Sequence, residues 1–156
     1  MNAFAASARA AVSSGIVGNI AIGIYLCIAL PLFFKAPALR LFQWDDSNIV
    51  GSSAYGGGWA SAAQGLFFDF IVACCWGAGF VILYRLLPMV RRSIVASGLA
   101  FGAIVWLVMF FVVVPIGKAQ HPSLAVAALL NAIVAHTLFF GLPVALVVRK
   151  SLQLER

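Results

Sequence analysis

Charged residues are scarce in this chain of 156 residues. Asp, Glu, Lys and Arg make up only 9% of the sequence, whereas 64% is hydrophobic and the mean hydropathy is +1.09. A soluble domain carries about 25% charged and about 45–50% apolar residues. This chain therefore has too few polar side chains to cover a folded surface in water. The composition excludes a soluble globular protein and indicates one integral membrane domain spanning residues 1–156.

Residue types that carry catalytic or cofactor chemistry are also few. The chain has two histidines, three cysteines and four acidic residues, and every cysteine lies in an apolar run where a thiolate is disfavoured. A bis-histidine haem needs two axial ligands at suitable depth, and no phosphate-binding loop is present. We therefore expect no cofactor, no metal and no catalytic set, which favours a protein that is not an enzyme.

Four apolar runs are long enough to cross a bilayer, which takes about 20 residues. They cover approximately residues 11–34, 59–83, 93–116 and 124–148. The first connection mixes Leu, Phe and Trp with Arg and Gln, as is typical of a short helix lying in the headgroup region. The glycine-rich stretch 52–59 is either a flexible lead-in or an extra turn of the second span. The sequence predicts an all-α, four-transmembrane-helix bundle with a short interfacial helix in the first loop.

The distribution of basic residues predicts the orientation. The N-terminal segment, the second loop and the C-terminal segment hold most of them: Arg9, Arg85, Arg91, Arg92, Arg149, Lys150 and Arg156. The first and third loops hold Lys35, Arg40 and Lys118. Basic loops stay in the cytoplasm, so both termini are expected there, with Asp45 and Asp46 outside. Topology accounts for the net charge of +6, and we expect no nucleic-acid partner.

Small residues recur at four-residue spacing in three of the spans. Such stripes let helix backbones approach closely in lipid, where no hydrophobic force drives association. The expected packing glycines are Gly15, Gly23, Gly65, Gly77, Gly98 and Gly102. These faces predict helix–helix contacts, within the chain or between copies.

Asp69 is the one acid within an apolar span, on the same stripe as Gly65 and Gly77. An ionised carboxyl near the bilayer centre costs about 2.5–3.5 kcal/mol even on lenient scales, so it should be protonated or paired. At 1.5 Å per residue, Asp69 falls in height between Asn131 and His136, and Asn19 lies somewhat nearer the cytoplasm. We expect Asp69 to bond His136 or Asn131, which lie about 140° apart around their helix.

These four polar residues, Asp69, His136, Asn131 and Asn19, allow three interpretations. Buried polar pairs can simply fix the register of helices, at about 0.6 kcal/mol per interhelical hydrogen bond. Alternatively, ionisable residues within a membrane mark a site for protons, an ion or a small substrate. The third interpretation is exposure at a contact between copies of the chain, and the sequence leaves all three open.

Several short motifs resemble small four-helix bacterial membrane proteins of the YagU-like kind. They are YRLLP at residues 84–88, SGLAFG at residues 97–102, Pro115 at the end of the third span, and His136 in the fourth. FQWDDSN at residues 42–48 is also similar. The resemblance implies the bacterial inner membrane. Relatives of this kind often carry histidine near the position of Asp69, so no site residue carries over.

Three functions remain open from the sequence. The first is an accessory subunit or self-associating scaffold that acts through helix contacts. The second is a transporter or channel for a small solute, an ion or protons, formed by a homo-oligomer and using Asp69, Asn131 and His136. The third is a membrane redox or enzyme subunit. The partners expected are the lipid bilayer and either further copies of the chain or a larger membrane complex.

Overall fold

The computed structural model describes residues 2–153, and all regular secondary structure in that range is helical. Four helical segments are long and apolar enough to cross a membrane. They are α1 (Ala3–Phe34), α3 (Gly58–Leu86), the continuous segment Ile94–Ile116 and the continuous segment Val126–Gln153. The predicted all-α fold with four candidate spans is confirmed.

The first and last helices extend beyond the predicted spans. α1 begins at Ala3, with the Asn2 side chain accepting a hydrogen bond from Phe4 N at 3.1 Å. This N-cap satisfies one of the backbone donors that the first helical turn leaves free. The fourth segment continues to Gln153 rather than ending near residue 148. Arg156 lies outside the described residues.

The third and fourth spans each change helix type partway. The third consists of α5 (Ile94–Val108), the π-helix η2 (Met109–Val113) and α6 (Val114–Ile116). The fourth consists of α7 (Val126–Val134), the π-helix η3 (Ala135–Gly141) and α8 (Leu142–Gln153).

A proline follows each π-helix after one intervening residue: Pro115 after η2 and Pro143 after η3. Proline lacks the N–H of the α-helical ladder, and its ring clashes with the carbonyl four residues earlier. The wider π turn accommodates that clash.

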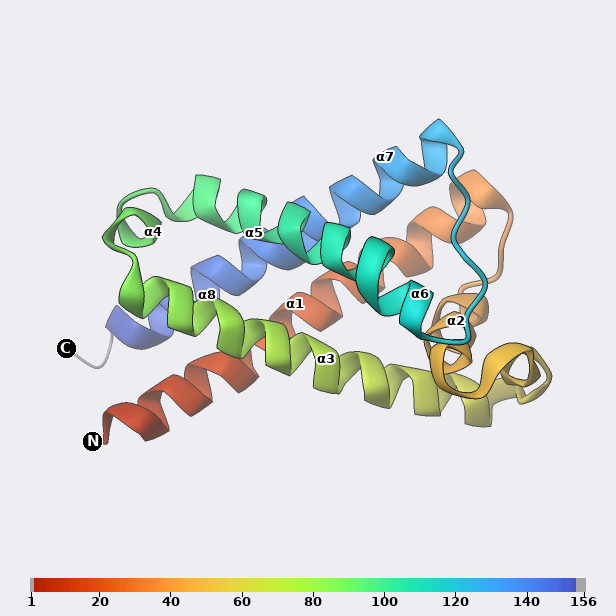
Figure 1. Cartoon of the computed structure of the whole chain (residues 1–156), viewed down its shortest axis with the longest axis horizontal. Helices are drawn as coiled ribbons and strands as arrows, with labels where there is room; N and C mark the ends of the chain where they lie inside the picture. Colours follow the sequence, from red (N-terminus) through yellow and green to blue (C-terminus); the bar gives the residue numbers. More distant parts are fainter. Residues whose placement is uncertain (1, 154–156) are drawn as a thin grey trace.

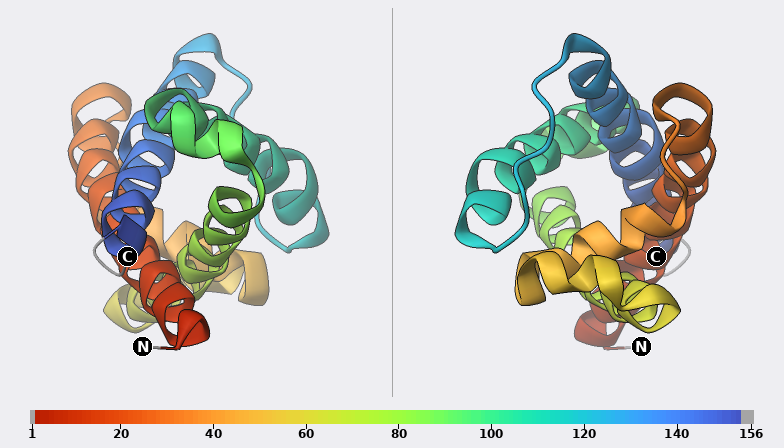
Figure 2. Two further views of the ribbon diagram at one scale, coloured as in Figure 1. Left: turned by 90° about the vertical axis from the view of Figure 1, so that its left-hand side faces the viewer. Right: turned by 90° about the vertical axis from the view of Figure 1, so that its right-hand side faces the viewer.

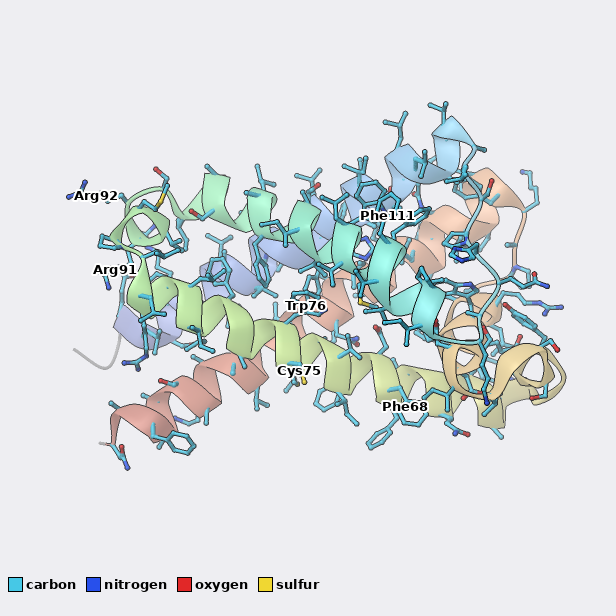
Figure 3. All side chains as sticks on the ribbon, viewed as in Figure 1. Phe68, Cys75, Trp76, Arg91, Arg92 and Phe111 are labelled. Atoms are coloured by element: carbon cyan, nitrogen blue, oxygen red, sulfur yellow. The ribbon has the colours of Figure 1, made fainter. Side chains whose placement is uncertain are left out.

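Successive spans run in opposite directions along the length of the bundle (Figure 1). α1 packs against α3 and α8, and α5 packs against η3 and α8. The start of α1, the short α4 (Pro88–Arg92) and the end of α8 lie at one end of the bundle (Figure 1). Arg91 and Arg92 project from this end (Figure 3), which we call the basic end.

The hydrophobic core lies toward the basic end. Phe80 of α3 and Phe101 of α5 meet edge to face with ring centroids 5.0 Å apart, and Trp76 contacts Phe101 at 5.9 Å. These rings fill the space between α3 and α5, whose backbones do not approach closely in the described residues. Val144 and Val148 of α8 complete the core and are fully buried. This half of the bundle is well packed.

Five of the six expected packing glycines lie where helices touch. A Cβ on Gly15 would come within 2.6 Å of Cys74 Cα, and one on Gly77 would meet the Ala11 carbonyl. Gly98 and Gly102 lie against the fourth span, opposite the missed residue Gly141. These stripes therefore hold the chain's own helices together.

Gly23 departs from the expected packing stripe. A Cβ there would find no other atom within 4 Å, so this glycine lies against open space rather than against another helix. It is one turn beyond Asn19, and the close approach of α1 to α3 ends between these two residues.

The first loop contains the predicted short helix, α2 (Leu39–Val50), followed by the 3₁₀ helix η1 (Gly51–Gly56). The stretch expected as a lead-in or an extra turn therefore forms most of η1, and α3 begins at Gly58. α2 runs across the end of the bundle opposite the basic end (Figure 2, right). It crosses α3 at Gly65, where a Cβ would collide with the Phe42 carbonyl.

Polar contacts attach α2 to its surroundings. Trp44 Nε1 donates to the Gln120 carbonyl at 3.2 Å, and Lys118 N donates to the Asn48 carbonyl at 2.9 Å. Ser61 Oγ of α3 donates to Asp46 Oδ2 at 2.5 Å, and Asp46 is only 1% exposed. Asp46, expected outside the spans, is thus buried between α2 and α3.

The crossing at Gly65 makes a testable prediction. Gly65→Val should displace α2 and lower the free energy of unfolding by about 1–3 kcal/mol, because extra side-chain volume is forced into a close contact. Gly79→Ala on the same helix is the control, since its Cβ would meet no other atom within 4 Å. Unfolding of both variants in detergent measures the difference. Equal stability of the two variants would show that α2 does not cross α3 in this way.

Candidate functional site

A cavity of about 360 Å³ lies between the spans, on the side of the bundle where α2 crosses. All four spans, α2 and residues 122–123 contribute to its lining. Most of the lining is apolar, and both π-helices take part, η2 through Met109 and Phe110 and η3 through Ala135 and His136. The polar lining residues are Arg40, Asp45, Asp69, Ser123, Asn131 and His136. Three of the four predicted polar candidates therefore meet at one cavity.

Asp69 is paired with Asn19, and the expected bond to His136 or Asn131 is wrong. Asn19 Nδ2 donates to Asp69 Oδ2 at 2.6 Å, which joins α1 to α3. Comparing heights assumes parallel helices, whereas α1 and α3 touch at Gly15 and Ala73, one helical turn nearer the basic end than this pair. Asp69 therefore bonds a residue on the helix that lies close to it, rather than a residue at the same height on a more distant helix.

Asn131 has a partner of its own on α1. Tyr25 donates its hydroxyl hydrogen to Asn131 Oδ1 at 2.8 Å, and the Tyr25 ring stacks on Phe139 with centroids 4.2 Å apart. The bond joins the first and fourth spans beside the cavity. The amide Nδ2 of Asn131 is not needed for this contact and remains a donor for the cavity.

His136 bonds within its own helix. Its Nδ1 lies 2.8 Å from the carbonyl of Ala132, one turn earlier. A carbonyl can only accept, so Nδ1 carries the hydrogen and Nε2 of the neutral ring is an acceptor. No hydrogen bond from another described residue reaches Nε2. The π-helix thus supplies the cavity with a fixed imidazole.

Asp45 is the site residue that the sequence analysis missed as a cavity group. It lies on α2 one turn after Leu41 and beside Trp44, and all three residues line the cavity. Burial holds the pKa of the Asp45 carboxyl well above its ordinary value, and the negative charge of Asp69 raises that pKa further. Two carboxyl groups from different helices therefore share one cavity.

Two further groups complete the polar lining. The Arg40 guanidinium lies over the Tyr55 ring, 4.9 Å from its centroid, and the residue is exposed. Its charge is therefore held at the rim of the cavity. Trp106 lines the interior, and its buried indole Nε1–H has no hydrogen-bond partner among residues 2–153. A buried donor without an acceptor is costly, so a ligand oxygen here would be stabilising.

The donor set does not suit a metal ion. Within residues 2–153, no three His, Cys, Asp or Glu side chains cluster in a way that could hold one. Cys75 is exposed on α3 and points away from the bundle (Figure 3). What the cavity offers is two acids, one imidazole, an unpaired donor and aromatic walls.

No protein family, curated protein or solved structure matches this chain. The resemblance to YagU-like proteins therefore stays a prediction, and the site must be interpreted from its own chemistry.

The Asn19–Asp69 bond can be tested with a double-mutant cycle. Asn19→Ala, Asp69→Ala and the double variant should show a coupling energy of about 0.6–1.7 kcal/mol, which runs from the average to the maximum measured for interhelical hydrogen bonds in a membrane protein. Unfolding in mixed micelles gives each value. The matched control pairs Asn19→Ala with Tyr25→Phe, which removes the separate bond to Asn131; no coupling is expected there. Additive effects of Asn19 and Asp69 would contradict the pairing.

Proposed function

We propose that this protein binds a small organic cation in the cavity beneath α2, as the substrate site of a membrane transporter. The observation that carries the proposal is the meeting of Asp45 and Asp69 in one largely apolar cavity at the membrane-spanning bundle. Ligand sites are commonly concave and apolar with a few placed polar groups, at volumes of about 300–1,000 Å³. Ionisable residues at membrane depth commonly belong to substrate pathways.

The charge of the lining favours a cation. Asp45 and Asp69 contribute acidic groups from α2 and α3, whereas the guanidinium of Arg40 lies over the Tyr55 ring at the rim of the cavity. Neutral His136 adds an acceptor at Nε2. An anionic ligand would meet the negative charge of this carboxyl pair, and like charges repel strongly in a low-dielectric site.

The walls favour a cation whose charge lies on an alkylated nitrogen. Trp44, Trp106 and Phe110 line the cavity, and aromatic faces attract quaternary ammonium groups through cation–π interactions. Alkyl groups around the nitrogen also match the apolar lining. The free Nε1–H of Trp106 fits a ligand that carries an acceptor oxygen as well.

The cavity favours this binding function over the role of a scaffold. The small-residue stripes that suggested self-association are occupied by contacts within the chain, such as Gly15 against Cys74 and Gly102 against Thr137. A redox or enzyme subunit has less support, because the lining holds no thiol and one imidazole.

The proposed setting follows from the basic residues. We place the basic end in the cytoplasm of a bacterial inner membrane, in keeping with the positive-inside rule. The cavity and α2 then face the outer side. Transport across the packed half requires a second conformation or further copies of the chain, since four helices make a poor pore alone.

Binding of choline tests the function. Choline and 3,3-dimethylbutan-1-ol share shape and hydroxyl group and differ in having a charged nitrogen or a neutral carbon. We expect calorimetry of the protein in detergent to detect choline and to show much weaker binding of the neutral isostere. Asp69→Asn should weaken choline binding about tenfold or more, because an ion pair within a protein is worth several kcal/mol before desolvation.

Asp46→Asn is the matched control. Asp46 neighbours Asp45 but is not part of the lining, and asparagine can still accept the hydrogen bond from Ser61. Its affinity for choline should equal that of the wild type. Equal binding of choline and its neutral isostere would refute a cation site. Counterflow of labelled choline in proteoliposomes then separates transport from binding alone.

A further inference from the structure

We propose that the Asp45–Asp69 pair exchanges one proton for each organic cation bound, so that the proton is the coupling ion of this site. The inference rests on the proposed function and adds a second substrate to it. It begins from the placement of two carboxyl groups, one on α2 and one on α3, in the lining of a single cavity.

Two carboxyl groups in one largely apolar cavity do not both ionise readily. The first negative charge opposes the second, and the protons leave in two separate steps that belong to the pair. The charge of Asp69 acts on Asp45 in this structure, in addition to the burial of Asp45. In the proposed exchange, the empty pair carries one negative charge and one proton near neutral pH.

The hydrogen bonds indicate which of the two carboxyl groups carries the negative charge and which holds the proton. Asn19 Nδ2 donates to Asp69 Oδ2 at 2.6 Å, and an N–H donated to a carboxylate oxygen stabilises its charge. No corresponding donor to the Asp45 carboxyl is seen among residues 2–153. In the proposed exchange, Asp69 is therefore the anion and Asp45 holds the proton when the cavity contains no cation.

Other titratable groups around the pair are few. On α2, Arg40 is the second charged lining residue, and its guanidinium sits over Tyr55 of η1. On η3, His136 faces the cavity with Nδ1 bonded to the Ala132 carbonyl. The lining residues of α1, α5, η2, α6 and α7 carry no titratable side chain, and neither do those of residues 122–123. Lys118 and His121 precede that stretch and are not part of the lining.

The exchange balances in charge. Before binding, the pair carries one proton and a net charge of −1. A monovalent cation beside Asp69 neutralises the charge that opposes ionisation of Asp45 and attracts the new carboxylate. The O–H bond of Asp45 breaks, its electron pair stays on the carboxylate, and the proton leaves to solvent. The pair then carries −2 and the cation +1, so the net charge of the cavity remains −1.

The sign of the pH dependence follows. Because binding releases a proton, a lower proton concentration favours binding, and choline affinity should rise as pH rises. The increase should approach about tenfold per pH unit between the pKa of Asp45 in the bound state and its higher pKa in the empty state. Above that window the affinity should level off.

Proton release on choline binding tests the exchange. Choline's quaternary nitrogen has no proton, so protons released near neutral pH come from the protein. Calorimetry of wild-type protein in buffers of different ionisation enthalpy gives the number released, and we expect close to one. Infrared difference spectra provide a measurement that needs no variant: binding should remove the carbonyl stretch of a protonated carboxyl group.

Variants identify the group that releases the proton. Asp45→Asn should bind choline with no proton release and no pH dependence in this window, whereas Asp46→Asn should release the proton as the wild type does. His136→Gln should bind choline more weakly, but the number of protons released per choline bound should stay close to one. Loss of release in His136→Gln alone would overturn the inference by moving the proton to the imidazole. Choline binding without proton release at any pH would overturn it while leaving the cation site intact. Absence of choline binding would instead overturn the proposed function itself.

Discussion

The pairing of Asn19 with Asp69 is the interaction on which the two halves of this structure depend. Lipid offers no hydrogen bond to a carboxyl group, so Asp69 needs a protein partner wherever it lies in the bilayer. Asn19 supplies that partner at 2.6 Å, one turn beyond the contact between Gly15 and Cys74. On one side of the pair α1 and α3 pack closely. On the other side Gly23 faces open space, and the cavity begins.

Two prolines and the first loop shape the cavity that opens where α1 and α3 separate. The π-helices before Pro115 and Pro143 place Phe110 and His136 at the wall, because a π turn shifts the angle at which side chains leave the helix. α2 then covers the end of the bundle by crossing α3 at Gly65. The π-helices and the crossing of α2 each have a local cause in the sequence. Together they leave polar groups facing the same cavity.

Much of the fold could be predicted from the sequence, but less of the site. Apolar runs fix where helices lie, and small-residue spacing fixes which faces meet, as at Gly77 and Gly102. The partner of Asp69 was missed because it depends on which helices touch, which no single helix encodes. Asp45 was missed for another reason. It follows Leu41 by one helical turn and Trp44 by one residue. The helix that carries them was predicted to lie in the headgroup region, with Asp45 outside, whereas all three residues line the cavity.

The close-packed core lies toward the basic end and the polar cavity toward the end that α2 crosses. This arrangement also determines which part of the molecule can move with the smaller loss of contacts. Parting α1 from α3 would open backbone contacts at Gly15 and Gly77 and disturb the core around Phe80. Moving α2 would open its close contact with α3 at Gly65 and break a small set of polar contacts, including Trp44 to Gln120 and Ser61 to Asp46. Interhelical hydrogen bonds of this kind are individually weak in membrane proteins. Because α2 also carries Asp45, a change in the charge of that carboxyl acts directly on the element that covers the cavity.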